Sequence, residues 1–296
     1  MSSWTPTDMP DQAGRRFVVT GANSGIGLAA ARELAAHGAR VVLAVRDTAK
    51  GETAAREIEG EAVVRELDLA DLGSVRAFAE GMEGEIDVLV NNAGVMATPK
   101  RKTKDGFELQ FGTNHLGHFA LTGLLLPKIR DRVVTVSSPA HRMGRINFDN
   151  LQGDRNYQRW LAYGQSKLAN LLFMYELQRR LEAAKSPLRS MAAHPGYAAT
   201  NLQFKTESIQ DKIMGLTNRL LAQSAEQGGW PTLYAATMDI PGGSYAGPDG
   251  FMEQRGNPKL VGSSGAARDE EKARRLWETS EELTGVRYEF GVAAGA

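Results

Sequence analysis

The sequence decides its fold at Thr20-Gly21-Ala22-Asn23-Ser24-Gly25-Ile26-Gly27. This segment follows an apolar run typical of a strand, 17–19, and precedes an alanine-rich stretch typical of a helix, 25–37. Glycine at such a turn permits a tight bend, and the first N–H groups of the helix stay free to bind a phosphate. The spacing is Gly-x-x-x-Gly-x-Gly, not the more general Gly-x-Gly-x-x-Gly. The segment therefore predicts a dinucleotide site, with a glycine-rich turn that holds no ligand as the alternative.

Apolar runs alternate with helix-like segments along the rest of the chain. Strands that alternate with helices form right-handed βαβ units, and a nearly continuous apolar strand such as 86–90 suits a sheet that is covered on both faces. We expect an α/β protein with a single Rossmann-type doubly wound parallel sheet and helices on both faces. The expected strands are 17–19, 40–45, 62–67, 86–90, 132–136 and 188–193, and the expected helices are 25–37, a segment that ends near 58, 74–82, 108–129, 160–183 and 266–283.

The chain shows no linker of the kind that separates domains. Residues 1–14 are polar and contain Pro6 and Pro10, so we expect a flexible N-terminal leader before a single domain at 15–296. Two segments look irregular, 139–159 and 197–227. Loops of this length in a compact domain are usually functional or mobile, and 197–227 is the predicted substrate loop.

Composition excludes several classes of function. The 296 residues carry a formal net charge of zero, which gives no electrostatic case for nucleic acid or an anionic membrane. There is no cysteine, no signal peptide and no apolar run of about 20 residues that would span a membrane. We expect a cytoplasmic protein that binds neither nucleic acid nor membrane, and no cluster of ligand residues predicts a metal site.

The end of the second predicted strand indicates which dinucleotide binds. An acidic residue there would hold a ribose 2′-hydroxyl group, whereas an arginine accommodates a 2′-phosphate. The strand ends at Val45 and Arg46 follows, which favours NADP(H) over NAD(H). Asp47 is positioned to neutralise part of this charge, and a solvated surface arginine is the alternative.

Tyr163 and Lys167 lie four residues apart in a predicted helix, so their side chains share one face. A protonated lysine beside a phenol favours the phenolate, and we expect Lys167 to lower the pKa of Tyr163 toward neutrality. Tyrosine would then serve as a general acid or base. The same spacing also occurs by chance on many amphipathic helices, so the interpretation of Tyr163 and Lys167 as a catalytic pair depends on the motifs around them.

That context resembles the short-chain dehydrogenase/reductase family over nearly the whole chain. Residues 20–27 are similar to its cofactor turn, Asp68 and Leu69 to its adenine contacts, and Asn91-Asn92-Ala93-Gly94 to the stabilising turn after its fourth strand. Pro195-Gly196 and Thr200 are similar to the segment that borders nicotinamide and pyrophosphate. The family's catalytic tetrad is matched, in order, by Asn114, Ser138, Tyr163 and Lys167.

The resemblance implies a role for each member of the tetrad. Tyr163 would exchange the proton, and Lys167 would also bind the nicotinamide ribose. Ser138 would bond to the substrate oxygen, and strand alternation places Ser137 on the opposite side. Asn114 would hold a water that links Lys167 to solvent.

Finer features resemble the retinol dehydrogenase and WW-domain oxidoreductase group. These are the segments 136–141, 146–151 and 166–170, together with the 25-residue spacing from Ser138 to Tyr163. We expect neither the N-terminal membrane anchor of many retinol dehydrogenases nor the tryptophan-rich adaptor module, which argues against a retinoid substrate and a membrane location. The resemblance also suggests a homodimer or homotetramer through the helices of Asn114 and Tyr163.

The two irregular segments supply the candidate substrate walls. Apolar and aromatic residues there suggest a mainly hydrophobic small molecule, although they also suit ordinary loop packing. His115, His118 and His194 are expected to be structural. The candidate substrate residues are His141, Met143, Tyr157 and Trp160 before the tyrosine helix, and Tyr197, Leu202 and Phe204 after the sixth strand.

The most direct interpretation is an NADP(H)-dependent oxidoreductase that interconverts an alcohol and a carbonyl group. One alternative is a non-catalytic protein that senses NADPH, although the complete tetrad argues against it. Another is a reductase of carbon–carbon double bonds like the protochlorophyllide reductases, for which the absence of cysteine removes one plausible proton donor.

Overall fold

The computed structural model describes residues 3–196 and 224–290. Its framework is one eight-stranded sheet with the order β3-β2-β1-β4-β5-β6-β7-β8. Every neighbouring pair is parallel except β7 and β8, which run antiparallel at one edge. The strands are β1 (Arg16–Thr20), β2 (Arg40–Val45), β3 (Glu61–Glu66), β4 (Ile86–Asn91), β5 (Ile129–Val136), β6 (Arg189–Ala193), β7 (Tyr245–Pro248) and β8 (Pro258–Leu260).

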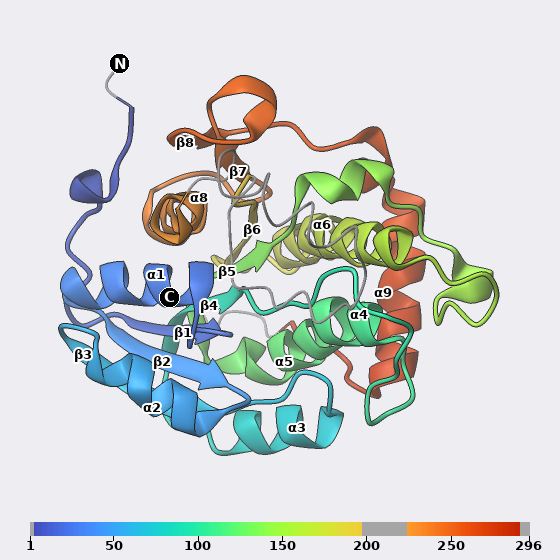
Figure 1. Ribbon diagram of the computed structural model, residues 1–296, viewed down its shortest axis with the longest axis horizontal. Helices are drawn as coiled ribbons and strands as arrows, with labels where there is room; N and C mark the ends of the chain where they lie inside the picture. Colours follow the sequence, from blue (N-terminus) through green and yellow to red (C-terminus); the bar gives the residue numbers. More distant parts are fainter. Residues whose placement is uncertain (1–2, 197–223, 291–296) are drawn as a thin grey trace, which may run out of the picture.

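Helices cover both faces of this sheet (Figure 1). Helices α1, α2 and α8 pack on one face, and α3, α5 and α6 on the other. Helix α9 packs outside α5 and α6 and forms a third layer there. The helices are α1 (Gly25–Ala36), α2 (Thr48–Arg56), α3 (Leu72–Glu80), α4 (Leu109–Phe111), α5 (Gly117–Leu125), α6 (Arg159–Ala183), α8 (Ala225–Thr237) and α9 (Glu270–Thr284).

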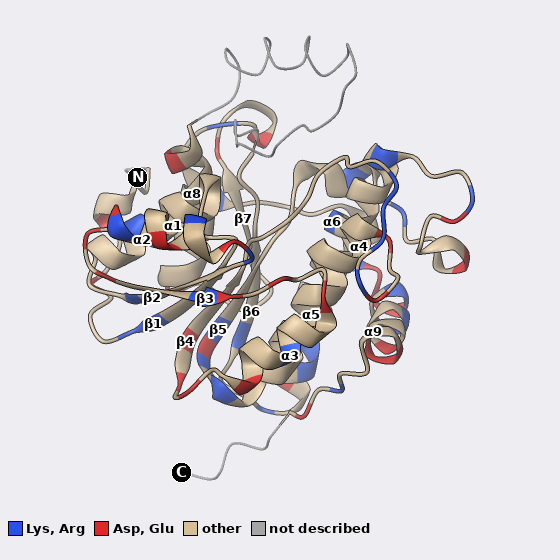
Figure 2. Cartoon of the chain, turned by 60° about the horizontal axis from the view of Figure 1, so that its bottom comes forward, with Lys and Arg blue, Asp and Glu red and all other residues tan. Residues whose placement is uncertain are grey.

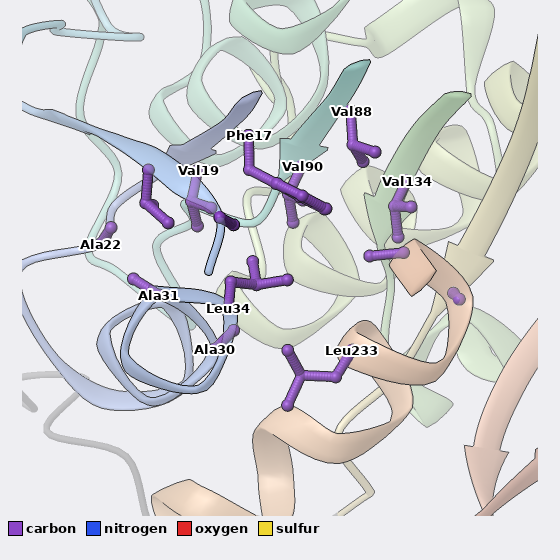
Figure 3. Packing of buried hydrophobic residues seen from close by; sticks show 14 of the residues in the cluster. Phe17, Val19, Ala22, Ala30, Ala31, Leu34, Val88, Val90, Val134 and Leu233 are labelled. Carbon is purple, nitrogen blue, oxygen red and sulfur yellow. The ribbon is translucent and has the colours of Figure 1, made fainter. Parts of the chain in front are cut away.

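Alternation along the central strands divides the core into two layers. Phe17 and Val19 of β1 point toward α1, whereas Val18 between them points toward the opposite face. Figure 3 shows the first layer, in which strand residues meet Leu34 of α1 and Leu233 of α8. Because both faces of the sheet are buried, its central strands contain few polar residues.

The parallel register brings the carboxyl ends of β1, β4, β5 and β6 to the same edge. Phe17 lies opposite Val88, Asn91 opposite Thr135, and Val136 opposite Ala193. The segments that follow these strands therefore meet at one edge, which is where open α/β sheets bind ligands. Charged residues cluster at the amino ends of β4, β5 and β6, at the edge of the sheet opposite to the one formed by the carboxyl ends (Figure 2).

All six expected strands are confirmed, five of them within one residue, and β5 begins three residues earlier than expected; most expected helices agree within two residues. The structure adds the short strands β7 and β8 and helix α8, which the sequence did not predict. The expected helix 108–129 is interrupted by a π turn at Gly112–Leu116 and ends in a 3₁₀ turn at Leu126–Lys128.

The N-terminal segment is not the flexible leader that we expected, at least from residue 3 onward. Trp4 and Met9 are buried in the core, and the Trp4 ring meets Tyr234 of α8 edge-on at 5.5 Å. The backbone N–H of Gln12 also donates to the His37 carbonyl at the end of α1. The expectation failed because the segment is polar on average but carries isolated apolar residues that reach the core.

No helix within 3–196 or 224–290 has both the length and the apolar character that crossing a membrane requires.

Candidate active site

The predicted cofactor turn joins β1 to α1 in the conformation that its glycines allow. Gly21 and Gly25 have φ angles of +68° and +55°, which favour glycine. Gly27 lies in the first turn of α1, where a Cβ atom would overlap the Asn92 side chain and stand 2.7 Å from the Gly21 carbonyl oxygen. Glycine at these positions therefore lets α1 begin directly against the turn.

The start of α1 fits the pyrophosphate group of a dinucleotide. Its first turn contains no acidic side chain, and Ser24 makes no side-chain capping hydrogen bond. The first N–H groups of a helix have no partner within the helix, and its N-terminus carries partial positive charge. Asn23, Ser24 and Ile26 are not buried, so this end of the helix is open to a ligand.

Thr20 holds the cofactor turn against the turn that follows β4. Its hydroxyl oxygen accepts the backbone N–H groups of Asn92 and Ala93, each at 2.9 Å. Asn92 returns a hydrogen bond from Nδ2 to the Thr20 carbonyl at 2.7 Å. The stabilising role expected for this turn is therefore visible in its contacts.

Arg46 is exposed directly after β2. Among the described residues, no carboxylate forms an ion pair with Arg46. The neighbouring Asp47 caps α2 and is bound by the Lys50 ammonium at 2.7 Å, and these hydrogen bonds from Lys50 lower the pKa of Asp47. The negative charge of Asp47, which we expected to neutralise Arg46 in part, is therefore shared between Arg46 and Lys50.

Asp68 and Leu69 lie beyond the end of β3, on the same edge of the sheet. Asp68 is partly exposed, and its carboxylate accepts the Ala70 N–H at 2.9 Å. Leu69 is buried, and a Cβ at Gly117 of α5 would overlap its carbonyl. Close packing of α5 thus fixes the backbone of this pair.

Ser138, Tyr163 and Lys167 meet where β5 ends against α6. The Ser138 hydroxyl lies close enough to the Tyr163 phenol to lower its pKa, and the Lys167 ammonium lies 5.8 Å from the centre of the tyrosine ring. Ser137 points elsewhere and donates to the Lys167 carbonyl at 2.8 Å. Ser138 is thus the member of the serine pair that faces Tyr163.

A backbone contact brings these groups together. Gly144 ends the 3₁₀ turn Pro139–Met143, and a Cβ there would overlap the Gly164 carbonyl on α6. A Cβ at Gly164 would in turn stand 3.0 Å from the Ala140 carbonyl oxygen and 3.2 Å from the Gly144 Cα. The segment after Ser138 and the helix of Tyr163 therefore touch without intervening side chains.

The pKa of Tyr163 moves in the opposite direction from our expectation. Burial raises it to about 12, and the nearby Ser138 hydroxyl offsets this rise only in part. Burial also lowers the pKa of Lys167 to about 8. The Lys167 ammonium donates to the Val136 carbonyl at 3.1 Å and does not bond to the phenol. Desolvation therefore outweighs the attraction that the spacing suggested.

Asn114 lies in the π turn, fully buried, and its side chain is already bonded. Its Nδ2 donates to the Val95 carbonyl and to the Ser166 hydroxyl, each at 2.9 Å, and its Oδ1 accepts the Val95 N–H at 2.8 Å. This amide is committed to these partners, so it does not suit the water-holding role that we expected of it.

Two of the predicted substrate residues support the structure instead. His141 is 1% exposed, donates from Nδ1 to the Ser138 carbonyl at 2.7 Å and accepts the Ser264 N–H. Tyr157 bonds to the Thr98 carbonyl at 2.9 Å and to Glu108 at 3.2 Å. The sequence placed them near the site but did not show these partners.

The other two described candidates remain available to a substrate. The Trp160 ring meets the Tyr163 ring edge-on at 6.4 Å, and Met143 is 51% exposed beside Gly164. Tyr197, Thr200, Leu202 and Phe204 lie outside the described residues, as does most of the predicted substrate loop 197–227.

Residues between β7 and β8 reach the site, which the sequence did not reveal. Gly196 has a φ angle of +65°, and a Cβ there would overlap the Gln254 carbonyl. The Gly196 N–H donates to His194 Nδ1 at 3.1 Å, and Nε2 of this buried histidine is 3.2 Å from the Glu253 carboxylate, without the alignment of a full hydrogen bond. Only the pairing of β7 with β6 brings Glu253 here, so no local signal identified it.

Known proteins resemble this chain in sequence and in fold. Residues 15–211 match the sequence pattern of the family described as short chain dehydrogenase. Retinol dehydrogenase 11 of Homo sapiens is 42% identical, with 97% of this chain and 91% of that protein covered. The solved structure of an uncharacterised protein from Mycobacterium Paratuberculosis is 55% identical, covers 97% of this chain and 100% of its own, and has a TM-score of 0.86.

A more distant structure from Beutenbergia cavernae is described as an NAD(P) dependent gluconate 5-dehydrogenase with bound NADP at low occupancy. It is 27% identical, covers 77% of this chain and 92% of its own, and has a TM-score of 0.58. Together with the matched pattern and the geometry of the site, these similarities lead to one conclusion: the chain is an oxidoreductase that belongs to the short-chain dehydrogenase/reductase family, in its retinol dehydrogenase-like branch.

Proposed function

We propose that this protein transfers hydride between NADP(H) and an alcohol or carbonyl carbon of a mainly hydrophobic small molecule. The observation that carries the proposal is the meeting of Ser138, Tyr163 and the buried Lys167 at the sheet edge that also holds the cofactor turn. When bound, the nicotinamide would supply the hydride chemistry. Residues 20–27 and Pro195-Gly196 would hold the cofactor.

The chain's own groups handle the proton. With a pKa raised to about 12, Tyr163 is protonated throughout the neutral range, so it carries the proton that a carbonyl oxygen receives on reduction. Ser138 would bond to the same oxygen as its negative charge develops. Lys167, buried beside them, would bind the nicotinamide ribose and restore the proton of Tyr163.

The test is a panel of aldehydes, ketones and alcohols assayed with NADPH and with NADH. We expect Tyr163→Phe to lower kcat/KM by about 10²–10⁴-fold, the usual contribution of a general acid. Tyr175→Phe, on the same helix with its hydroxyl bonded to Ser263, is the matched control and should keep its activity. Near-normal turnover by a folded Tyr163→Phe protein would contradict the assignment, and no turnover by the wild type would favour a sensor of NADPH.

The preference for NADP(H) rests on Arg46. Its guanidinium is exposed and Lys50 already holds the adjacent carboxylate, which supports a role for Arg46 in binding a 2′-phosphate. We expect Arg46→Ala to raise the KM for NADPH by about 10- to 100-fold, corresponding to roughly 1.5–3 kcal/mol for a charge-assisted hydrogen bond, with little change for NADH. Arg56→Ala, an exposed arginine on α2, is the control. Equal effects on the two cofactors would count against this preference.

A further inference from the structure

His194 is a fully buried histidine at the point where β6 leads into Pro195-Gly196, the predicted nicotinamide segment. Its backbone N–H donates to the Ala246 carbonyl at 2.9 Å, and a Cβ at Gly247 would overlap its Nε2 atom, so the ring lies against β7. A buried imidazole needs partners for both ring nitrogens, because an unpaired polar group in the interior costs free energy.

The partners of the two ring nitrogens determine where the His194 proton lies. The Gly196 N–H donates to Nδ1 at 3.1 Å, so Nδ1 is an acceptor and carries no proton. The proton of the neutral ring is therefore on Nε2, which lies 3.2 Å from the Glu253 carboxylate. The alignment falls short of a full hydrogen bond, so this contact is mainly electrostatic. One imidazole thus connects the backbone of the nicotinamide segment to a carboxylate between β7 and β8.

The turn that carries Glu253 is packed directly against Gly196. A Cβ at Gly196 would overlap the Gln254 carbonyl oxygen and stand 2.9 Å from that of Glu253. Met252 and Glu253 have φ angles of +52° and +56°, which are uncommon for residues other than glycine. Such conformations persist where the surrounding contacts hold them, and they are frequent at functional sites. This turn therefore presents the Glu253 carboxylate to His194 at some cost in backbone strain.

Glu253 also faces the turn that follows the catalytic serine. The Arg142 guanidinium lies 3.7 Å from its carboxylate and donates to the Gly262 carbonyl at 3.1 Å. Arg142 belongs to the 3₁₀ turn Pro139–Met143, which begins directly after Ser138. The contact with His194 and the charge of Arg142 lower the pKa of Glu253, which keeps it ionised at neutral pH. One carboxylate thus contacts the segments on both sides of the site.

We propose that Glu253 is a positioning residue that acts through His194 to hold Pro195-Gly196 in place for the nicotinamide half of the cofactor. The carboxylate attracts the Nε2–H group, and the ring then presents Nδ1 to the Gly196 N–H. The segment is thereby ordered before a cofactor binds, which reduces the entropy that binding must remove. The inference rests on the proposed function, in which Pro195-Gly196 hold the cofactor.

The first test compares the two halves of the cofactor by binding titration and requires no turnover. Glu253→Ala should raise the Kd of NADPH by about 3- to 30-fold, as expected for a residue that acts on a ligand through another. The Kd of adenosine 2′,5′-bisphosphate, which lacks the nicotinamide half, should not change. Glu253→Gln keeps an oxygen that can accept the Nε2–H group and should bind NADPH more tightly than Glu253→Ala. Gln254→Ala removes the exposed side chain next to Glu253 and is the matched control.

The second test examines whether Glu253 acts through His194. His194→Asn keeps an oxygen that can accept the Gly196 N–H but is too short to reach the carboxylate. In this background Glu253→Ala should change the Kd of NADPH little further, because residues in contact have non-additive effects. Additive effects of the two substitutions would overturn the proposal.

The third test needs no ligand. Ring ¹⁵N NMR of histidine-labelled, cofactor-free protein at pH 8 should show a signal set with Nε2 protonated and Nδ1 unprotonated that disappears in His194→Asn. A His194 protonated at Nδ1 would overturn the proposal whether or not the protein reduces a carbonyl. This measurement and the Gln variant decide the matter if Glu253→Ala does not fold.

The remaining outcomes separate this inference from the proposed function. Equal losses of affinity for NADPH and for the bisphosphate in Glu253→Ala would show that Glu253 supports the fold in general, against the proposal. An unchanged Kd of NADPH in that variant would overturn the positioning role even if the wild type is an active reductase. A wild type that binds NADPH with the expected dependence on Glu253 but turns over no substrate would support the positioning role and contradict only the catalytic proposal.

Discussion

Gly27 shows how a single hydrogen atom in place of a methyl group shapes the cofactor turn. A Cβ there would overlap Asn92 Nδ2, which is bonded to the Thr20 carbonyl, and would crowd the Gly21 carbonyl. Neither neighbour is the free end of a flexible side chain. Substitution must therefore move the turn itself.

We expect Gly27→Ala to lower the free energy of unfolding by about 1–3 kcal/mol, the usual range for an overpacked site, and to weaken NADPH binding. Urea unfolding and cofactor titration measure the two effects. Gly229→Ala in α8 is the control, because the added Cβ would meet its neighbours at 3.5 Å or more. Replacing glycine with alanine in a helix also favours the helix by up to about 1 kcal/mol. Equal stability of the two variants would contradict this account.

At the scale of single residues, the sequence predicted which residues form the site better than it predicted their pKa values and contacts. It identified Ser138 and Tyr163: strand alternation allowed only one of Ser137 and Ser138 to face the site, and the family pattern selected Ser138. It did not predict the raised pKa of Tyr163, because burial depends on the whole assembly around α6. It also missed Glu253, which reaches the site only through the pairing of β7 with β6.

Among the elements, those with long apolar patterns were predictable and the short ones were not. Strand β8 has only three residues, and β7 ends in a Gly-Pro pair that is typical of a turn. Helix α8 contains Pro231 and two adjacent glycines, which disfavour a helix in isolation. Packing of α8 against α1 and the sheet overrides these local preferences.

Helix α9 bears on the expected oligomer. Its Trp277 packs on Phe119 of α5 and Phe173 of α6 with ring centres 5.1 and 5.8 Å away, and Arg180 lies over its ring. Beyond the helix, the Tyr288 hydroxyl donates to the Phe119 carbonyl at 2.6 Å. The chain thus covers its own α5–α6 surface, the one that we expected to join subunits.

We therefore expect no dimer through α5 and α6. Light scattering should give the monomer mass of 32.1 kDa, and hydrogen exchange in α9 should not depend on protein concentration. Loss of the covering ring in Trp277→Ala should cost about 3–5 kcal/mol of stability without creating a dimer. A doubled mass with concentration-dependent protection of α9 would contradict the prediction.

Two of the four buried histidines, His115 and His118, have strongly lowered pKa values, which makes the stability of the molecule depend on pH. Burial lowers the pKa of His115 to about 3 and that of His118 to about 4, whereas both titrate near 6.5 in the unfolded chain. Below pH 6.5 the unfolded state therefore binds more protons than the folded state. Their stabilising contribution is fully present above pH 6.5 and is lost as the pH falls toward 3–4.

Between pH 7 and pH 5 we expect the free energy of unfolding to fall by about 2 kcal/mol for each of these histidines. Urea unfolding at the two pH values gives the measurement. In His115→Gln the free energy of unfolding should fall by about 2 kcal/mol less than in the wild type over the same pH range. A free energy of unfolding that rises toward pH 5, or an unchanged slope in that variant, would show that the buried histidines do not set this dependence.

The backbone contact between Gly144 and Gly164 has a practical consequence for anyone who seeks to change what the protein acts on. Any side chain at Gly144 would collide with the main chain of α6, so mutant libraries that randomise this position would yield mostly inactive clones. Diversity is better introduced at Met143 and Leu161, whose side chains are about half exposed. Keeping the Gly144–Gly164 contact leaves the surroundings of Tyr163 unchanged, while the half-exposed positions can be varied and screened.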